Sequence, residues 1–195
     1  MTNSESALTL ILGGARSGKS TYAEGLAPKL GQRVLYVATA EALDDEMRAR
    51  VAAHQSRRPP DWATLEAPLN VGAELRASAD AGDVDVILLD CLTLLVSNII
   101  LSGGPDAPEP DVEAAWTMVE AELEALVEAH LQFDTHLIIV SNEVGLGVVP
   151  PYSLGRTYRD CLGRANQTLA RLADHAILMV AGLPVDLKAL PLAWQ

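Results

Sequence analysis

The sequence predicts an α/β fold, a doubly wound and mostly parallel sheet with helices on both faces. Apolar strand-like runs alternate with helical patterns along the chain, as expected where helices cross between parallel strands. A glycine-rich turn joins the first such run, Leu8–Leu12, to the first helical pattern. In addition, Val86–Asp90 is apolar on both sides until its last residue, which is typical of a central strand in a parallel sheet.

Apolar spacing and helix-ending residues divide the chain into its elements. The predicted strands are Leu8–Leu12, Arg33–Ala38, Trp62–Glu66, Val86–Asp90, His136–Asn142 and His175–Val180. The predicted helices with clear ends are Ser20–Leu30, which Gly31 ends, and a helix that Asn70 caps and Gly82 ends. The other predicted helices are Asp44–Gln55, Leu92–Leu101, Val112–Leu131 and Gly155–Ala173. Glycine and proline concentrate in Ser102–Asp111, which predicts a loop.

Composition limits the class of protein. The 195 residues are 49% hydrophobic, enough for one domain spanning residues 1–195, in which we expect residues 1–6 to be disordered. The net charge of -12, without any basic run, argues against nucleic acid or an anionic membrane as a partner. No apolar stretch approaches the roughly 20 residues that span a bilayer, and the N-terminus does not resemble a signal peptide. The two cysteines, Cys91 and Cys161, predict buried thiols, which fits a reducing cytoplasm.

The turn after the first strand, GGARSGKS, matches the phosphate-binding pattern G-x-x-x-x-G-K-[ST]. Its glycines permit positive φ, so that successive N–H groups and the next helix's N-terminus can converge on phosphate oxygens. Lys19 can reach the β and γ phosphates, and Ser20 can hold Mg²⁺. The candidate nucleotide-binding residues of this P-loop are Gly13, Gly14, Ala15, Arg16, Ser17, Gly18, Lys19 and Ser20. A glycine-rich turn without a ligand is the alternative.

Asp90 closes the apolar strand Val86–Leu89, which is the Walker B pattern. A carboxylate at the carboxyl end of a strand beside a P-loop can hold Mg²⁺ directly or through water. The alternative is a structural role as the N-cap of the helix that begins near Leu92.

His54 is the residue that could add a second chemistry. It shares one helical face with Met47 and Val51, so the pattern alone favours a packed structural histidine. Two arginines, Arg57 and Arg58, follow in a proline-ended turn that could present them to a triphosphate. A histidine beside phosphate-binding arginines is a plausible nucleophile toward phosphorus.

Polar residues elsewhere give weaker signals. Asn142 and Glu143 directly follow a predicted strand, where they could contact a γ phosphate or place a water, but turn capping explains them equally well. Three arginines of the last helix could line an anionic ligand, although a solvated helix face explains them more simply. They are Arg156, Arg159 and Arg164.

Five motifs in this order resemble one family. They are GGARSGKS at Gly13–Ser20, DDEMRARVAAH at Asp44–His54, DCLT at Asp90–Thr93, SNEVGLGVVP at Ser141–Pro150 and YRDCLGRANQ at Tyr158–Gln167. The chain is similar to the bifunctional adenosylcobinamide kinase / adenosylcobinamide-phosphate guanylyltransferases of adenosylcobalamin (vitamin B12) biosynthesis. The resemblance extends from the first strand to about Val180, and the ordered set is far more specific than the P-loop alone.

The resemblance implies a RecA-like P-loop NTPase fold, assembled as a homotrimer, that performs two reactions. Adenosylcobinamide is first phosphorylated with ATP or GTP. GMP is then transferred from GTP through a covalent guanylyl-histidine to give adenosylcobinamide-GDP. His54 matches the guanylylated histidine, and Lys19 is the second catalytic residue. The resemblance adds to the nucleotide site Ala38, Thr39, Ala40, Gln55, Ser56, Arg57, Arg58, Glu66 and Asp90.

Some assignments stay open at this point. Mg²⁺ is expected at Ser20 and Asp90, but the resemblance leaves open whether Asp90 or Glu66 contacts metal, base or ribose. Pro151-Tyr152 departs from the family, whose members carry a glutamate after the equivalent of Pro150. The tail 181–195 matches loosely and is expected to be an oligomer contact or a frayed end.

Two other functions compete with the bifunctional enzyme. A P-loop kinase for a small molecule would leave His54 structural, and a nonenzymatic nucleotide switch would only report occupancy to a partner. Incubation with α-labelled GTP separates the three, since only guanylyl transfer through the enzyme leaves a covalent label.

Overall fold

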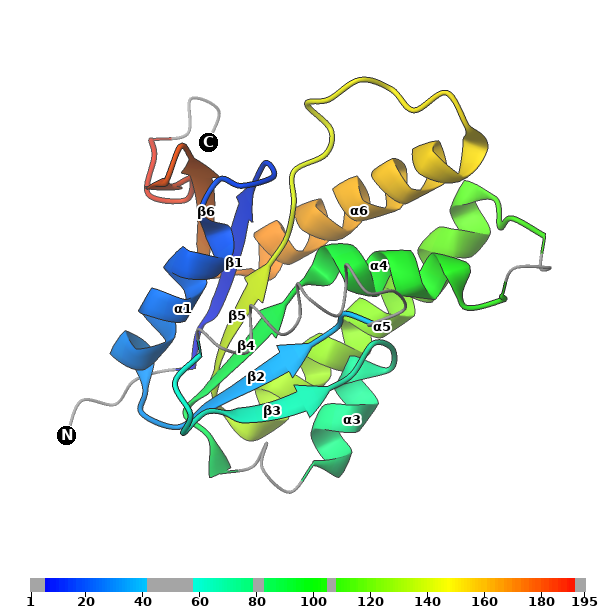
Figure 1. Ribbon diagram of the computed structural model, residues 1–195. Coiled ribbons are helices and arrows are strands. Elements are labelled where there is room, and N and C mark those ends of the chain that lie inside the picture. Colours follow the sequence, from blue (N-terminus) through cyan, green and yellow to red (C-terminus); the bar gives the residue numbers. More distant parts are fainter. Residues whose placement is uncertain (1–5, 42–57, 79–82, 105–107, 192–195) are drawn as a thin grey trace.

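A seven-stranded sheet in the order β3-β2-β4-β5-β1-β6-β7 forms the centre of the molecule (Figure 1). The computed structural model describes residues 6–41, 58–78, 83–104 and 108–191. Strands β1 to β6 are parallel to their neighbours, and β7 is antiparallel to β6. The strands are β1 Leu8–Gly13, β2 Val34–Ala38, β3 Ala63–Glu66, β4 Val86–Asp90, β5 His136–Val140, β6 His175–Val180 and β7 Leu183–Asp186.

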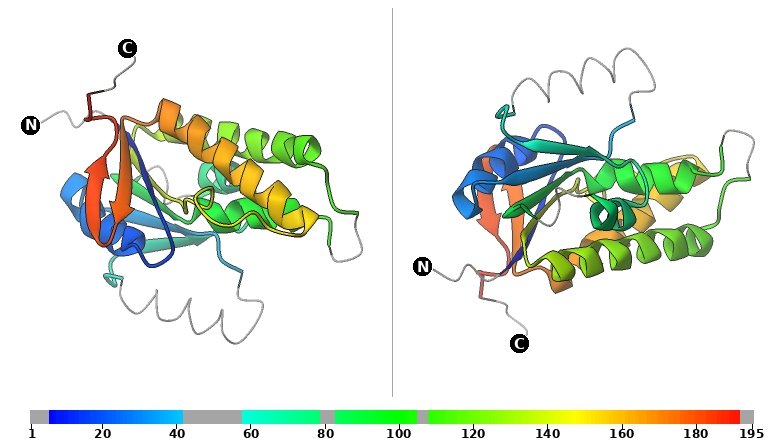
Figure 2. Two further views of the ribbon diagram at one scale, coloured as in Figure 1. Left: turned by 90° about the horizontal axis from the view of Figure 1, so that it is seen from above. Right: turned by 90° about the horizontal axis from the view of Figure 1, so that it is seen from below.

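Helices cover both faces of the sheet, as Figure 2 shows from two sides. Alternate strand residues point to opposite faces and so divide the core into two clusters. Helix α1 packs on one face, while α3, α4, α5 and α6 pack on the other. The helices are α1 Lys19–Leu30, α3 Val71–Ala77, α4 Leu92–Leu101, α5 Val112–Phe133 and α6 Ser153–Leu172. This architecture confirms the predicted fold class.

Three elements, β4, α4 and β6, have the predicted bounds, and most other ends differ by one or two residues. One helix is shorter than predicted, since α3 ends at Ala77 and not near Gly82. The N–H of Ser78 donates to the carbonyls of Glu74 and Leu75 while Ser78 itself turns extended, which stops the helix. The predicted helix Asp44–Gln55 lies outside the described residues.

The sequence analysis does not predict strand β7, because its residues fall within the loosely matched tail 181–195. It is joined to β6 by a two-residue turn in which Ala181 and Gly182 both have positive φ, 51° and 83°. Such a turn matches the twist of a β-hairpin. Asp186 Oδ2 lies 2.8 Å from His175 Nδ1 and fastens β7 to the start of β6. The frayed-end alternative is therefore wrong for Leu183–Asp186.

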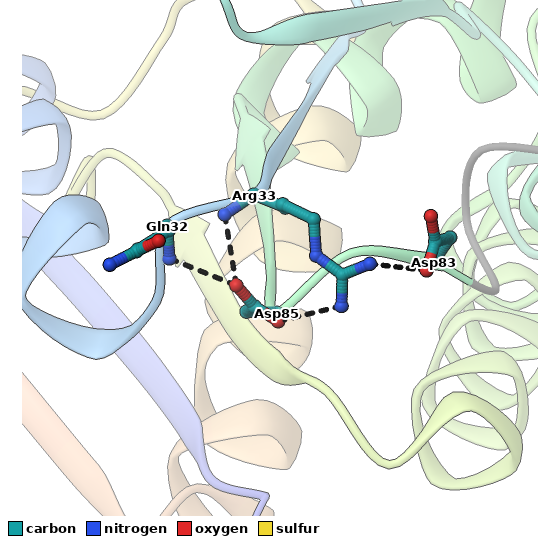
Figure 3. Close-up of polar contacts among 4 residues, drawn as sticks. All are labelled: Gln32, Arg33, Asp83 and Asp85. Atoms are coloured by element: carbon teal, nitrogen blue, oxygen red, sulfur yellow. Dashed lines mark hydrogen bonds and ion pairs between the residues drawn. The ribbon is translucent and has the colours of Figure 1, made fainter.

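The amino ends of β2 and β4 are joined by the polar cluster in Figure 3. One carboxylate oxygen of Asp85 accepts hydrogen bonds from the backbone N–H groups of Gln32 and Arg33, each at 2.9 Å. The Arg33 guanidinium also pairs with Asp83 and with the second oxygen of Asp85. Hydrogen bonds from Arg33, first its backbone N–H, hold the pKa of Asp85 below its usual range. Gly31 is needed for space here, since a Cβ would lie 2.2 Å from the Cβ of Asp85.

Candidate nucleotide site

The P-loop connects the carboxyl end of β1 to the start of α1. Its path uses positive φ at Gly13 (152°), Arg16 (58°) and Gly18 (95°). A side chain at Gly13 would place its Cβ 2.5 Å from the Met179 carbonyl oxygen, so strand β6 also requires glycine here. This geometry is the one that the GGARSGKS motif predicts.

Lys19 is the buried cation of the site, with 8% of its surface exposed. Its Nζ donates to the carbonyl oxygen of Gly14 at 2.7 Å, so the side chain folds back over its own loop. Burial lowers the pKa of Lys19, and the nearby negative charge of Asp90 opposes that shift. Among the described residues Lys19 has no ion pair. An anionic ligand in the loop would therefore meet a positive charge that no carboxylate directly neutralises.

Two neighbouring segments brace the P-loop. The N–H of Gly182, in the β6–β7 turn, donates to the carbonyl of Ser17 at 3.0 Å, and the N–H of Glu143 donates to the carbonyl of Gly13 at 3.1 Å. The Ser17 hydroxyl oxygen is buried and has no hydrogen-bond partner in the described part of the chain. No sequence pattern predicts the contact at Gly182, since β7 itself is not predicted.

The carboxyl ends of β2 and β4 lie side by side, next to that of β3. Ala38 is opposite Glu66 on one side and Asp90 on the other. The Thr39 hydroxyl donates to the Cys91 carbonyl at 2.8 Å and accepts from the Cys91 N–H at 2.9 Å. Asn98 of α4, missed in the sequence analysis, donates to the carbonyls of Thr39 and Pro68. Its one signal was an amide side chain within a mostly apolar helix. Ala40 is half-buried beside these residues.

Asp90 does not cap the following helix, because the N-cap residue of α4 is Cys91 and makes no side-chain capping bond. The Asp90 carboxylate instead lies near the Tyr36 hydroxyl, whose pKa its negative charge helps to raise. Only β5 lies between β4 and β1, so Asp90 is about two strand spacings, or about 10 Å, from the P-loop strand. Glu66 is exposed and four spacings away, about 19 Å along the sheet.

The loop after β5 is held by buried polar contacts. Ser141 Oγ lies 2.6 Å from Asn166 Oδ1, and Asn166 also donates to the Asn142 carbonyl at 3.0 Å. The Asn142 N–H donates to the Thr93 hydroxyl at 2.9 Å. Glu143 accepts from the N–H of Gly145 at 2.6 Å, which is the turn-capping role proposed as its alternative. Asn166 was not singled out from the sequence, although it lies within one of the family motifs.

The three candidate arginines of α6 make contacts of a surface helix. Arg164 pairs with Glu113 at 2.7 Å, and Arg159 pairs with its neighbour Asp160 at 3.1 Å. Arg156 donates to the carbonyls of Pro150 and Pro151. These contacts agree with the simpler interpretation, a solvated helix face.

The segment that carries His54 falls largely outside the described residues, which exclude His54, Gln55, Ser56 and Arg57. Arg58 is described, and its guanidinium carbon lies 3.3 Å from the centroid of the Tyr36 ring.

Within the described ranges, no three His, Cys, Asp or Glu side chains come together as a metal site. None of the described helices is long and apolar enough to cross a bilayer. Cys91 and Cys161 are free thiols, and burial raises the pKa of Cys91 to about 11.

Comparison with known proteins identifies the family. The family model described as cobinamide kinase / cobinamide phosphate guanyltransferase matches residues 9–187. The chain belongs to this family. Curated relatives agree: the bifunctional adenosylcobalamin biosynthesis protein CobP of Pseudomonas aeruginosa is 46% identical over 183 residues, covering 94% of this chain and 98% of that protein. The CobU proteins of Escherichia coli and Salmonella typhimurium, with the same bifunctional description, are 40% and 41% identical and are covered to 99%.

These matches confirm the family and the pair of activities predicted from the motifs, a kinase and a guanylyltransferase. They also exclude the two competing interpretations, a kinase alone and a nonenzymatic switch, at the level of the family. The roles of individual residues are a separate question, taken up below.

Proposed function

We propose that this chain performs both reactions of its family at one nucleotide site. It phosphorylates adenosylcobinamide with ATP or GTP, then transfers GMP from GTP to that phosphate, giving adenosylcobinamide-GDP for adenosylcobalamin biosynthesis. The observation that carries the proposal is the P-loop with its buried, unneutralised Lys19. Both reactions develop negative charge on a polyphosphate, and one cradle of N–H groups and a cation can stabilise either.

In this site Lys19 leaves the Gly14 carbonyl and contacts the phosphates together with the loop N–H groups. Ser20 and Asp90 would hold Mg²⁺, which supplies a positive charge next to the leaving phosphates. Asp90 fits this role better than Glu66, since it is about 10 Å rather than about 19 Å from the P-loop strand and influences Lys19 electrostatically. Glu66, with Ala38, Thr39 and Ala40, is then left for ribose or for the N1–H and amine donors of guanine.

His54 is the proposed nucleophile of guanylyl transfer. Its neutral imidazole nitrogen attacks the α phosphorus of GTP, the bond to the β phosphate's bridging oxygen breaks, and pyrophosphate leaves. An oxygen of the corrinoid phosphate then displaces the histidine nitrogen from phosphorus, which forms the diphosphate and frees the enzyme. Gln55, Ser56, Arg57 and Arg58, which follow His54 in the chain, would contact the triphosphate.

Assembly and location follow from the family resemblance. We expect a homotrimer in the cytoplasm, with the corrinoid near a subunit boundary. Exposed apolar side chains support an association surface, including Leu146 at 90% and Val148 at 95% exposure in the loop before α6. Light scattering should give the mass of a trimer, and a monomeric mass at working concentration would contradict this part of the proposal.

The decisive experiment is incubation of wild type and His54→Ala with α-labelled GTP. Wild type should take up label in a bond that is labile in acid and resistant to alkali, as a phosphoramidate is. The His54→Ala variant should take up none and form no adenosylcobinamide-GDP, yet still phosphorylate adenosylcobinamide. A matched control is His175→Ala, whose exposed side chain pairs with Asp186 and should leave labelling unchanged. Labelling of His54→Ala at the wild-type rate would refute the assignment.

A further inference from the structure

Tyr36 stands between two residues of the nucleotide site without having been assigned a role there. It lies in β2 with 2% of its surface exposed, among the core residues on the α1 face of the sheet. Across the parallel pair it is opposite Leu88, and Ala38 is opposite Asp90, so Tyr36 and Asp90 share one face two residues apart. Both ends of the tyrosine, its ring and its hydroxyl, have a charged neighbour.

The hydroxyl holds Asp90. It is on the same face of the sheet as the Asp90 carboxylate. Burial, followed by the negative charge of Asp90 and by a hydrogen bond to it, raises the pKa of Tyr36 well above its ordinary value. The phenol therefore stays protonated at any working pH and remains a donor. A carboxylate that accepts such a bond is fixed in orientation while it keeps lone pairs for other ligands.

The ring holds Arg58. The guanidinium carbon lies 3.3 Å from the ring centroid, well within the range of a cation–π contact. The Nε and Nη1 atoms of Arg58 are buried and have no hydrogen-bond partner among the described residues. An arginine that is supported by a ring rather than by a carboxylate keeps its N–H donors free for another acceptor.

We propose that Tyr36 is a positioning residue for guanylyl transfer, whose ring holds the Arg58 guanidinium for the triphosphate while its hydroxyl fixes Asp90. This inference rests on the proposed function, because it uses the roles given there to Arg58 and Asp90. Tyr36 also keeps the two opposite charges from pairing directly with each other. A direct ion pair would occupy the donors and acceptors that the nucleotide needs.

The ring and the hydroxyl can be separated by substitution. The rate of covalent labelling from α-labelled GTP is measured for Arg58→Ala alone and in the Tyr36→Phe and Tyr36→Met backgrounds. Arg58→Ala should slow labelling about tenfold in wild type and equally in Tyr36→Phe, which keeps the ring. In Tyr36→Met, which has no ring, Arg58→Ala should have little further effect, because the support is already lost. A merely structural tyrosine would not produce this selective coupling.

Several outcomes would overturn the inference. One is that Arg58→Ala labels at the wild-type rate. Another is that the slowing of labelling by Arg58→Ala disappears in Tyr36→Phe, and a third is that this slowing is equal in all three backgrounds. If Tyr36→Met does not fold, Tyr36→Leu supplies the background without a ring, and the same comparison of Arg58→Ala effects applies to it. Tyr158→Phe is the matched control, since that hydroxyl only reaches the Thr93 carbonyl at 3.5 Å, and it should label normally. If wild type itself takes no label, the proposed function fails; the same variants compared by the Kd of GTP then test Tyr36 independently.

Discussion

Polar residues at the amino ends of β2 and β4 differ in their contacts from those at the carboxyl end of the sheet, around the P-loop and Arg58. At the amino ends, Asp85 accepts two backbone N–H bonds and pairs with Arg33, so the cluster in Figure 3 satisfies itself. At the carboxyl ends, Lys19 has only a carbonyl of its own loop, and buried polar atoms of Ser17 and Arg58 lack hydrogen-bond partners among the described residues. The polar cluster at the amino ends of β2 and β4 is therefore complete in itself, whereas the polar contacts around the P-loop and Arg58 are not.

This difference separates structure from function between the two ends of the sheet. Buried polar groups without partners destabilise a fold, so they persist where a ligand supplies the missing contacts. In open α/β sheets that place is the carboxyl end of the strands. Substitutions at the carboxyl end should therefore impair activity more than stability, and those at the amino end the reverse.

The largest expected effect is that of Lys19→Ala at the carboxyl end. Both the kinase step and the guanylylation step should fall by about a hundredfold or more, because each uses the same cation on a polyphosphate. Steady-state phosphorylation of adenosylcobinamide and labelling from α-labelled GTP measure the two steps. Lys29→Ala, an exposed lysine at the other end of α1, is the control and should behave as wild type. Normal turnover of either step in folded Lys19→Ala would contradict a shared site.

An intermediate effect is expected for Asp85→Ala at the amino end. Loss of an acceptor for two backbone N–H groups should lower the free energy of unfolding by about 1–2 kcal/mol, as for a lost helix cap. Activity per folded molecule should stay the same. Asp83→Ala is a matched control, since Asp83 also pairs with Arg33 but is exposed and, among the described residues, accepts from no backbone N–H. Urea unfolding measures both, and equal losses would show that the ion pair, not the backbone contact, is what matters.

Most of this arrangement was predictable from local sequence. The glycines and lysine of the P-loop impose their own geometry, and the two-sided apolar run of Val86–Leu89 could only be a central strand. Strand β7 was missed because it is a short edge strand containing Pro184, formed by a turn at Ala181 that residue type does not favour. The helix before Ser78 ended early for a similar reason, since its stop is made by serine rather than glycine.

The contacts within the site could not be predicted. Asn98 and Asn166 act through partners 24 to 59 positions away, and Tyr36 faces Asp90 of the neighbouring strand. No local pattern specifies such contacts. Asp90 is an example of this difference. Its place at the end of β4 was predictable, but whether its carboxylate would cap helix α4 or face Tyr36 depended on how β2 and β4 align.

The smallest expected effect is a dependence of stability on pH from His130, at the amino end of the sheet near the start of β5. His130 is 4% exposed, and its Nδ1 has no hydrogen-bond partner in the described ranges. Burial lowers its pKa; Asp174 and Asp134 oppose the shift, and His136 adds to it.

Because the pKa of His130 is lower in the folded state than the ordinary value near 6.5, the unfolded chain holds more protons between these two values. Stability should therefore fall as the pH falls below about 6.5 toward the folded-state pKa. His130→Gln removes this titration, while the other histidines respond equally in both proteins. The difference in the free energy of unfolding between wild type and His130→Gln should thus shift in favour of the variant from pH 7 to pH 5.5. A difference that is the same at both pH values would show that His130 is not held neutral by the fold.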